Sequence, residues 1–351
     1  MTKLWIRAEQ RANEVRVGIT PKGAESLLAK GFHVTIEESK TRVIDIAEYH
    51  QAGCTITTEN SWPNAPKDTI IFGLKELPED DIPLHHRHIM FGHAFKGQHS
   101  GQVLLSRFKA GGGQLYDLEY LVDEAGRRVA AFGYWAGYSG AAVSLKCWID
   151  QQKGQLCGPI TAFKNKDSLL KTLSTNLSAF KQRLPNAIVI GALGRVGTGA
   201  ADLCSALDIT VTRWDIAETN HGGPFPEILE HEVFLNCIMA QPDTPVFISL
   251  QDIEMTRKLR VIGDISCDPT CDYNPIAIYE AATSWYSPAE RVSMTPPLDV
   301  IGIDNLPSLL PLESSLDFAS QLLPWLLEID KLDQGVWQRA AKVFENNIIE
   351  G

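Results

Sequence analysis

The stretch AIVIGALGRVGTGAADLC, residues 187–204, decides the fold that this sequence predicts. An apolar run typical of a β-strand leads into a turn with glycines at positions 191, 194, 197 and 199, and a run typical of a helix follows. The pyrophosphate of a dinucleotide binds at such a turn, because glycine lets the backbone approach the phosphates and the helix N-terminus offers N–H groups. The pattern departs from G-x-G-x-x-G, since Ala192 stands at the first glycine position. We expect Gly194 at the phosphates and Gly197 where helix and strand pack closely.

A second β-like run, ITVTRW, follows and ends at Asp215, eighteen residues after Gly197. An acid at this place accepts hydrogen bonds from the adenosine ribose and repels a 2′-phosphate. The sequence therefore predicts NAD as the cofactor, although Arg195 and Arg213 leave NADP open. The plainer alternative is a glycine-rich turn in an ordinary α/β fold, with Asp215 a solvated strand end.

Apolar runs alternate with helical patterns along much of the chain, which is typical of parallel strands joined by crossover helices. The runs that predict strands are HVTIE (33–37), TIIFGL (69–74), AIVIG (187–191), ITVTRW (209–214), VFLNCIM (233–239) and VIGDIS (261–266), and those that predict helices are TPKGAESLLAKG (20–31) and TGAADLCSAL (198–207). The predicted class is α/β, with two Rossmann-like domains, parallel sheets and an active-site cleft between the domains.

The 351 residues exceed what one hydrophobic core usually fills, so two domains are expected. The tail reads helical from Ser314 to Phe344 without a strand of its own, and we expect it to return to the first domain. The prediction is a discontinuous substrate-binding domain of residues 1–133 plus 310–351 and an NAD-binding domain of residues 134–309. The apolar run 129–145 is too short to span a membrane and predicts a buried helix.

Composition excludes several classes of protein. With 43 acidic and 32 basic residues, the net charge of -11 disfavours nucleic acid and anionic membranes as partners, and the sequence contains no local basic patch. The charged stretch 1–16 is unlike a secretory signal, and the final NNIIEG lacks a peroxisomal tripeptide. Seven scattered cysteines predict reduced thiols in the cytoplasm, and no metal site is expected, because Cys267 and Cys271 lack further ligands at zinc spacing.

Two polar groups follow apolar runs in the first half of the chain. Lys75 and Glu76 close TIIFGLKE, and His93 follows HIMFG. Desolvation beside an apolar strand lowers the pKa of an ammonium, and a histidine already titrates near neutrality, so the two form a candidate acid–base pair. Each alone has a plainer interpretation, as a solvated lysine or a structural histidine.

Arginines beside apolar elements are candidates for gripping a dicarboxylate, because a guanidinium bonds a carboxylate in a bidentate manner. Arg16 in EVRVGITP and the Arg127–Arg128 pair in GRRVAAFG have this setting. Helix capping or a surface position is the alternative for each of them.

The sequence as a whole resembles the NAD-dependent, lysine-forming saccharopine dehydrogenases. The resemblance runs in order from the first residues to Pro311, and GRRVAAFG with IDNLPSLLP is far more specific than a glycine turn. The matching segments are RAEQRANEVRVGITP, IIFGLKELPED, HIMFGHAFK, QLYDLEYL, GRRVAAFGYWAGYSGAA, IGALGRVGTGAADL, WDIAET, GGPF, NCI, DISCDPT and IDNLPSLLP.

The resemblance implies an architecture related to alanine dehydrogenase and the nicotinamide nucleotide transhydrogenases. It also implies a reaction in which saccharopine, NAD and water give lysine, 2-oxoglutarate and NADH. Lys75 would accept the proton of the secondary amine, and His93 would act as acid and base in imine hydrolysis. Glu76 and Glu119 would tune the charge of this pair.

The resemblance also implies a full set of contacts, which includes the glycines, Asp215 and the arginines already singled out. At the substrate it places Arg16, Gln98, Arg128, Phe132, Ser266, Cys267 and Asp268. At the nucleotide it places Arg127, Gly194, Arg195, Gly197, Asp215, Thr219, Met239, Ile265, Ile303, Asp304, Asn305 and Leu306. The chain departs from the fungal pattern at four positions, with Val196 in place of Cys, Cys267 of Ala, Met239 of Tyr and Asn305 of His.

Two alternatives to this function remain at the level of sequence. One is a related amino-acid or opine-type dehydrogenase, such as an alanine dehydrogenase, and the other is a non-catalytic NAD-binding protein. The oligomeric state is open and compatible with a monomer, and no partner other than the small-molecule substrates is expected.

Overall fold

A computed structural model describes residues 1–11, 13–97, 99–181 and 183–350 of the chain. The chain forms two compact units. Unit 1 comprises Met1–Ala131 and Ser314–Gly351, and unit 2 comprises Phe132–Glu313. The chain thus leaves unit 1 once, builds the whole of unit 2, and returns.

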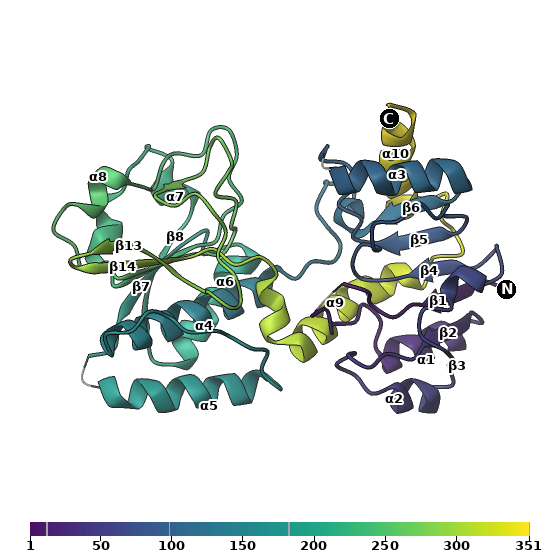
Figure 1. The fold of residues 1–351 in the computed structure, drawn as a ribbon, viewed down its shortest axis with the longest axis horizontal. Helices are drawn as coiled ribbons and strands as arrows, with labels where there is room; N and C mark the ends of the chain where they lie inside the picture. Colours follow the sequence, from purple (N-terminus) through teal and green to yellow (C-terminus); the bar gives the residue numbers. More distant parts are fainter. Residues whose placement is uncertain (12, 98, 182, 351) are drawn as a thin grey trace. The chain divides into compact units, whose positions relative to one another are not determined.

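Unit 1 is built around a six-stranded sheet in which every neighbouring pair is parallel (Figure 1). The strand order is β3-β2-β1-β4-β5-β6. The strands are β1 (Lys3–Ile6), β2 (His33–Glu37), β3 (Thr55–Thr57), β4 (Ile70–Phe72), β5 (Arg87–Met90) and β6 (Gln114–Asp117). The helices are α1 (Pro21–Ala29), α2 (Ile46–Gln51), α3 (His99–Gly111), α9 (Pro311–Leu326), whose first residues belong to unit 2, and α10 (Gly335–Glu350).

The residues at positions 20 and 21 explain where the first helix begins. Thr20 caps α1 by accepting a hydrogen bond from the Gly23 N–H at 3.1 Å, and Pro21 occupies the first turn, where its missing N–H costs nothing.

The C-terminal tail is not the single helical stretch that the sequence predicts. α9 ends at Leu326 and α10 begins at Gly335, whose positive φ of 56° marks a break between them. α10 then brings Phe344 into the same hydrophobic cluster as Phe108.

His88 on β5 is a buried polar side chain inside this cluster of aromatic groups. Its ring lies 5.1 Å from Trp62 and 5.4 Å from Phe108, centroid to centroid. Neither ring nitrogen has a hydrogen-bond partner among the residues that the structure describes. Burial, and then the charge of Arg7, lower the pKa of His88 well below its usual value. The folded state therefore holds this imidazole neutral.

Because His88 is buried and neutral, we expect unit 1 to lose stability at acidic pH. Below the pKa of about 6.5 that a free histidine has, the unfolded chain takes up a proton that folded His88 refuses, so the stability present above that pH is lost as the pH falls. The loss attributable to His88 is up to about 1.4 kcal/mol per pH unit. We expect His88→Leu to flatten the fall in unfolding free energy between pH 6.5 and 4.5, measured by urea denaturation. His85→Leu, at an exposed position of the same segment, should keep the wild-type slope, and an unchanged slope in His88→Leu would refute the assignment.

Unit 2 contains a second six-stranded sheet, of order β13-β14-β11-β9-β7-β8, and a small parallel pair, β10-β12. All neighbours in the large sheet are parallel except the edge pair β13-β14, so the predicted parallel sheet carries one antiparallel edge. The strands are β7 (Asn186–Ile190), β8 (Thr210–Trp214), β9 (Val233–Asn236), β10 (Ile248–Ser249), β11 (Val261–Asp264), β12 (Ile276–Ala277), β13 (Glu290–Met294) and β14 (Pro297–Ile301). The helices are α4 (Gly133–Gln152), α5 (Lys166–Leu177), α6 (Arg195–Ala206), α7 (Ile216–Thr219) and α8 (Leu250–Ile253).

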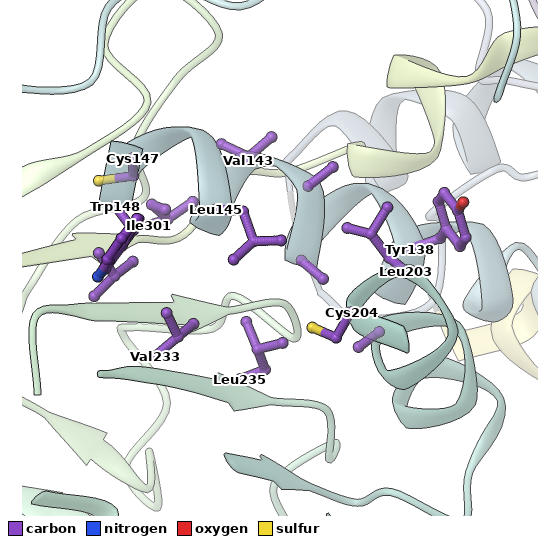
Figure 2. Close-up of a cluster of buried hydrophobic side chains, with 14 of the residues drawn as sticks. Tyr138, Val143, Leu145, Cys147, Trp148, Leu203, Cys204, Val233, Leu235 and Ile301 are labelled. Atoms are coloured by element: carbon purple, nitrogen blue, oxygen red, sulfur yellow. The ribbon is translucent and has the colours of Figure 1, made fainter. Parts of the chain in front are cut away.

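The central strands of unit 2 are buried on both faces, which is why they read as continuous apolar runs. Ala187 and Val189 of β7 belong to one hydrophobic cluster, and Ile188 and Ile190 belong to another. The first cluster includes side chains of α4 and α6, and Figure 2 shows Leu145 and Leu203 beside the strand residues Val233 and Leu235. This alternation follows from the opposite directions of successive side chains along a strand.

The predicted buried helix in residues 129–145 is confirmed as α4, although it begins only at Gly133 and extends to Gln152. Its contact with α6 depends on glycines. A Cβ atom on Gly137 would lie 1.8 Å from the Val196 carbonyl oxygen, and one on Gly199 would lie 1.9 Å from the Tyr134 carbonyl oxygen. The two backbones therefore approach more closely than any side chain allows. Among the described residues, no helix is both long and apolar enough to cross a bilayer.

Each sheet has one place where the strand order reverses. The reversal lies between β1 and β4 in unit 1 and between β7 and β9 in unit 2. Ligands of open α/β sheets bind outside the carboxyl ends of the strands at such places. We therefore expect functional residues in the segments that follow β1, β4, β7 and β9.

Candidate active site and cofactor site

Lys75 lies in the turn after β4, three residues past the strand end at Phe72, and so does not close the strand as the sequence had indicated. Its ammonium nitrogen lies 5.8 Å from the centroid of the Phe91 ring. Burial lowers the pKa of Lys75, and the positive charges of Arg16 and Arg11 lower it further against the opposing effect of Glu14 and Glu76. These effects make the ammonium easier to deprotonate, and the amine that results can accept a proton.

His93 has the same relation to β5, the neighbouring strand, which ends at Met90. Its φ of 49° places a non-glycine residue in the left-handed region, where strain is characteristic of functional sites. Its ring stacks on that of Phe91 with a centroid distance of 6.4 Å, so Phe91 contacts both Lys75 and His93. Burial and the charge of Lys75 lower the pKa of His93, while Glu76 and Glu119 oppose this.

Two carboxylates accompany this pair. Glu76 lies 3.3 Å from an Arg11 nitrogen and 3.9 Å from His93 Nε2, and Glu119 accepts a hydrogen bond from Lys96 at 3.0 Å. Burial alone would raise the pKa of Glu119, but Lys96 and other nearby cations lower it, so this carboxylate is charged. The charges of both acids thus raise the pKa of His93, and that of Glu76 also raises the pKa of Lys75.

Three buried polar atoms at this site lack a hydrogen-bond partner among the described residues. They are His93 Nε2, Glu76 Oε2 and Glu119 Oε2. Buried polar atoms are nearly always satisfied in folded proteins, so several exceptions at one place indicate a site that binds polar groups from outside.

Asp117, at the carboxyl end of β6, supports this site, and sequence reasoning missed it. Its carboxylate accepts hydrogen bonds from the N–H groups of Gly92 at 3.1 Å and Glu119 at 2.9 Å, and so holds the neighbours of His93. Burial raises the pKa of Asp117 to about 6, although both hydrogen bonds oppose the rise. The signal available in the sequence was an acid closing the apolar run of QLYD.

Arg16 is buried and forms an ion pair with Glu14, an acid that no sequence pattern indicated. Its Nε and one terminal nitrogen donate to the two oxygens of Glu14 at 2.8 and 2.7 Å. Burial raises the pKa of Glu14, but the bonds and charge of Arg16 outweigh this and lower it. Arg16 would therefore meet a substrate as half of an ion pair, and not as an isolated cation.

The other predicted substrate residues have varied settings. Arg128 is half-buried, and Phe132 precedes the first turn of α4. Ser266 is exposed and donates its hydroxyl hydrogen bond to the Ile238 carbonyl, and Asp268 is exposed nearby in sequence. Cys267 has a φ of 43°, and burial raises the pKa of its thiol to about 12. Gln98 lies outside the described residues.

The glycine turn of unit 2 connects β7 to α6. Gly194 is the N-cap of α6, and no side chain caps this helix end. A Cβ on Gly197 would lie 2.1 Å from the Gly191 carbonyl oxygen, so only glycine permits this approach of helix and turn. Asp215, at the end of β8, accepts hydrogen bonds from the N–H groups of Leu193 and Ile216, both at 2.9 Å. An uncapped helix end beside an acid fits the phosphates and ribose of a dinucleotide.

The remaining residues predicted at the nucleotide divide into exposed and buried groups. Arg127, Arg195, Met239 and Asp304 are exposed, and Arg127 also pairs with Asp123 at 3.0 Å. Asn305, with a φ of 65°, donates to Ser308, and Thr219 is buried and donates to the Asp215 carbonyl. Ile265, Ile303 and Leu306 belong to the hydrophobic core, at 8%, 2% and 3% exposure. Their side chains serve packing, so any contact of theirs with a cofactor would involve the backbone.

Comparisons with known proteins agree with this architecture. The family model described as alanine dehydrogenase/PNT, N-terminal domain, matches residues 5–139. The solved structure of an L-alanine dehydrogenase has a TM-score of 0.67 at 16% identity, over 98% of this chain and 94% of that one, so the predicted fold class is confirmed.

Two curated relatives extend over nearly the whole chain. The saccharopine dehydrogenase [NAD(+), L-lysine-forming] of Schizosaccharomyces pombe is 45% identical over 98% of both chains. The protein of the same name from Yarrowia lipolytica is 43% identical, over 99% of this chain and 98% of its own. Since identity at this level covers both units, the chain belongs to the family of NAD-dependent, L-lysine-forming saccharopine dehydrogenases.

Proposed function

We propose that this chain catalyses the reversible conversion of saccharopine, NAD and water to L-lysine, 2-oxoglutarate and NADH. The observation that carries the proposal is the identity of 45% to the Schizosaccharomyces pombe enzyme across 98% of both chains. The grouping of Lys75, His93 and unsatisfied carboxylate atoms at the carboxyl ends of β4, β5 and β6 supports it.

NAD, when bound, supplies the acceptor for the hydride that leaves the substrate carbon. Gly194 and Gly197 would allow its phosphates to approach the start of α6, and Asp215 would accept hydrogen bonds from its ribose. The carboxylate of Asp215 already accepts the N–H groups of Leu193, Ile216 and Glu218, and its two oxygens have room for one further donor. The other proposed contacts are Arg127, Arg195, Thr219, Met239, Asp304, Asn305 and the backbone of Ile265, Ile303 and Leu306.

In the proposed mechanism the neutral amine of Lys75 takes the proton from the secondary amine nitrogen of saccharopine. Loss of this proton, together with the hydride that NAD would accept when bound, leaves a carbon–nitrogen double bond. His93 removes a proton from the water that adds to this bond. His93 then returns a proton to the nitrogen as the adduct separates into lysine and 2-oxoglutarate. Glu76 and Glu119 offset the positive charge that gathers on Lys75 and His93.

Saccharopine carries several carboxylates, and guanidinium groups are their best partners. Arg128 and Arg16 are proposed for this task, with Phe132 covering the apolar part of the substrate. Ser266, Cys267, Asp268 and Gln98 complete the proposed substrate contacts.

The direct test is NADH oxidation, followed at 340 nm, with lysine and 2-oxoglutarate. Parallel reactions contain ornithine or alanine instead of lysine, pyruvate instead of 2-oxoglutarate, and NADPH instead of NADH. We expect loss of absorbance only with lysine, 2-oxoglutarate and NADH. Turnover with another pair would replace the substrate and keep an enzyme, whereas binding of NADH without turnover by any pair would favour a non-catalytic role.

Asp215 provides a separate prediction about cofactor choice. Asp215→Asn removes the charge that repels a 2′-phosphate but keeps an oxygen able to cap α7. We expect the ratio of kcat/KM for NADH to that for NADPH to fall about tenfold. Asp208→Asn, which changes an exposed acid in the same unit, should leave the ratio unchanged. An unaltered ratio in Asp215→Asn would argue against its position at the ribose.

A cytoplasmic location is part of the proposal. All seven cysteines are free thiols, as expected in a reducing compartment. Fractionation of cells that produce the chain, with detection by antibody, tests this location, and recovery in a membrane-bounded compartment would refute it.

A further inference from the structure

Arg7 and Glu9 lie directly after β1 and take no part in the chemistry proposed above. Arg7 is 1% exposed, and the side chain of Glu9 is 10% exposed. Burying two charges is costly unless each is thoroughly hydrogen-bonded. The hydrogen-bond partners of Arg7 and Glu9 therefore indicate which part of the fold these two residues stabilise.

Glu9 binds the backbone of the turn that carries Lys75. One carboxylate oxygen accepts the Leu74 N–H at 2.6 Å, and the other accepts the Lys75 N–H at 2.9 Å. These N–H groups lie beyond the end of β4, where the Leu74 carbonyl still accepts a hydrogen bond from the Phe91 N–H. The carboxylate thus takes the place of a strand partner at the two residues that direct the Lys75 side chain.

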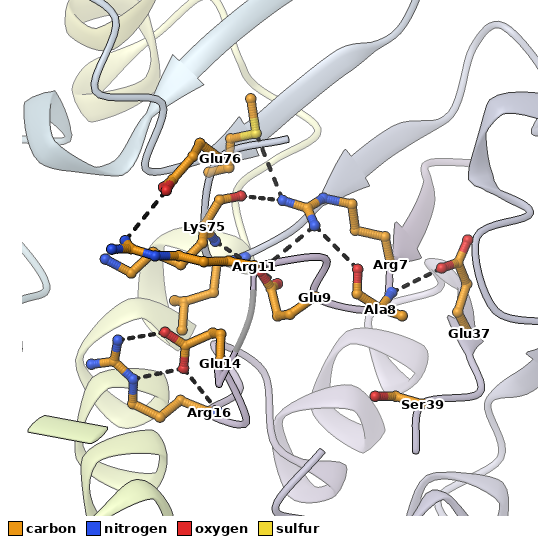
Figure 3. A network of polar contacts seen from close by, with 12 residues as sticks. Arg7, Ala8, Glu9, Arg11, Glu14, Arg16, Glu37, Ser39, Lys75 and Glu76 are labelled. Carbon is orange, nitrogen blue, oxygen red and sulfur yellow. Dashed lines mark hydrogen bonds and ion pairs between the residues drawn. The ribbon is translucent and has the colours of Figure 1, made fainter. Parts of the chain in front are cut away.

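Arg7 binds the same turn from another side. One terminal nitrogen lies 3.6 Å from a Glu9 oxygen and donates to the Ala8 carbonyl at 3.1 Å, and the other donates to the Lys75 carbonyl (Figure 3). A Cβ on Gly73 would lie 2.3 Å from the guanidinium carbon. Because residue 73 is a glycine, the Arg7 guanidinium has room to lie against the turn of residues 73–75.

We propose that Arg7 and Glu9 are positioning residues that fix the turn of residues 73–75 and so hold the amine of Lys75 against the Phe91 ring. The inference rests on the proposed function, in which that amine accepts a proton. Both the N–H and the carbonyl of Lys75 are held, so the direction of its side chain is set by the backbone. Without these bonds the turn can move, and the amine can reach water.

The effect of Glu9 is distinct from that of the charged groups that face the amine. Those groups are Arg11, Arg16, Glu14, Glu76 and His93. The two hydrogen bonds of Glu9 that reach this turn go to backbone N–H groups, so its contribution depends on where the carboxylate lies and not only on its charge. Glu9→Gln and Glu9→Asp separate the two, because Asp keeps the charge and is one methylene too short to span both N–H groups.

Glu37 on β2 offers a matched control. It is also a buried glutamate that accepts backbone N–H groups, those of Ala8 at 2.8 Å, Asn60 at 3.0 Å and Trp62 at 2.7 Å. None of these bonds reaches the turn of residues 73–75. Glu37→Gln therefore weakens unit 1 and keeps every bond of Arg7 and Glu9 to that turn.

The first experiment measures the reactivity of the Lys75 amine toward an acylating reagent as a function of pH, with mass spectrometry of the Lys75 peptide. It uses the full chain and needs no substrate. We expect the midpoint to rise by about one pH unit in Glu9→Gln and in Glu9→Asp, and to stay at the wild-type value in Glu37→Gln. A wild-type midpoint in both Glu9 variants overturns the proposal. A midpoint that falls in Glu9→Gln and stays at the wild-type value in Glu9→Asp also overturns it, because loss of a nearby negative charge by itself lowers the pKa of an ammonium.

The second experiment measures turnover across pH in the lysine-forming direction. We expect kcat to fall 10- to 100-fold in both Glu9 variants, with the acid limb moved to higher pH and the KM for NAD unchanged. Equal losses in Glu37→Gln would show a purely structural effect and contradict the proposal. If the wild-type chain fails to turn over saccharopine, the proposed function fails, while the labelling experiment still decides whether Glu9 holds the amine.

Discussion

We expect Lys75→Met to lower kcat for saccharopine oxidation about a thousandfold, while NADH binds as it does to the wild type. Methionine matches the length and apolar stem of lysine and can pack on Phe91, so the substitution removes little besides the amine. In the proposed mechanism this amine alone receives the proton of the secondary amine. Apart from Arg127, the proposed nucleotide residues lie in unit 2, which does not contain position 75.

Steady-state kinetics give kcat, and quenching of tryptophan fluorescence by NADH gives binding. Lys109→Met, on the exposed face of α3, serves as the control and should match the wild type in both measurements. Unchanged turnover in Lys75→Met would remove Lys75 from the role of base. Loss of NADH binding would show that the substitution acts on more than the proton transfer.

Gly137→Ala is the second substitution with a large expected effect, and it acts on stability. The added methyl group would meet the Val196 carbonyl oxygen at 1.8 Å and the Ala200 nitrogen at 2.9 Å. These are backbone atoms of α6 and cannot turn aside as a side chain can. The two helices must separate, at a cost of about 3 kcal/mol in the free energy of unfolding. Because α6 carries the glycine turn at its start, NADH binding should weaken as well.

Thermal unfolding with and without NADH measures both effects. Gly158→Ala is the matched control, because a Cβ at this position meets nothing within 4 Å. We expect a clear fall in Tm for Gly137→Ala and almost none for Gly158→Ala. Equal Tm values in the two variants would mean that α4 and α6 do not approach as described.

The sequence predicts the features of this fold that local patterns encode. The glycine turn, the strand before it and the acid at the next strand end all lie within about thirty residues, so their relation can be inferred without the fold. Lys75 and His93 were found because each follows a short apolar run. That the two runs become neighbouring strands is a property of the sheet order.

The sequence does not predict the contacts that join distant segments. Glu9 binds N–H groups 65 and 66 positions away, and Asp117 binds one 25 positions away. No periodicity relates such pairs, because they depend on which strands become neighbours. The resemblance does name residues from distant segments, such as Ile265, but it does not say whether their side chains or their backbones would contact the nucleotide.

The division of the chain between the units has a consequence for its synthesis. Unit 2 is one continuous segment and can close its core while the ribosome is still adding residues. Unit 1 cannot, because Phe344 from α10 belongs to the same cluster as Met90 and Phe108, which are made some 240 residues earlier. The half that carries Lys75 and His93 must wait with an incomplete core while the other half folds. A stalled or shortened chain would therefore present an open apolar surface to chaperones beside a finished nucleotide-binding unit.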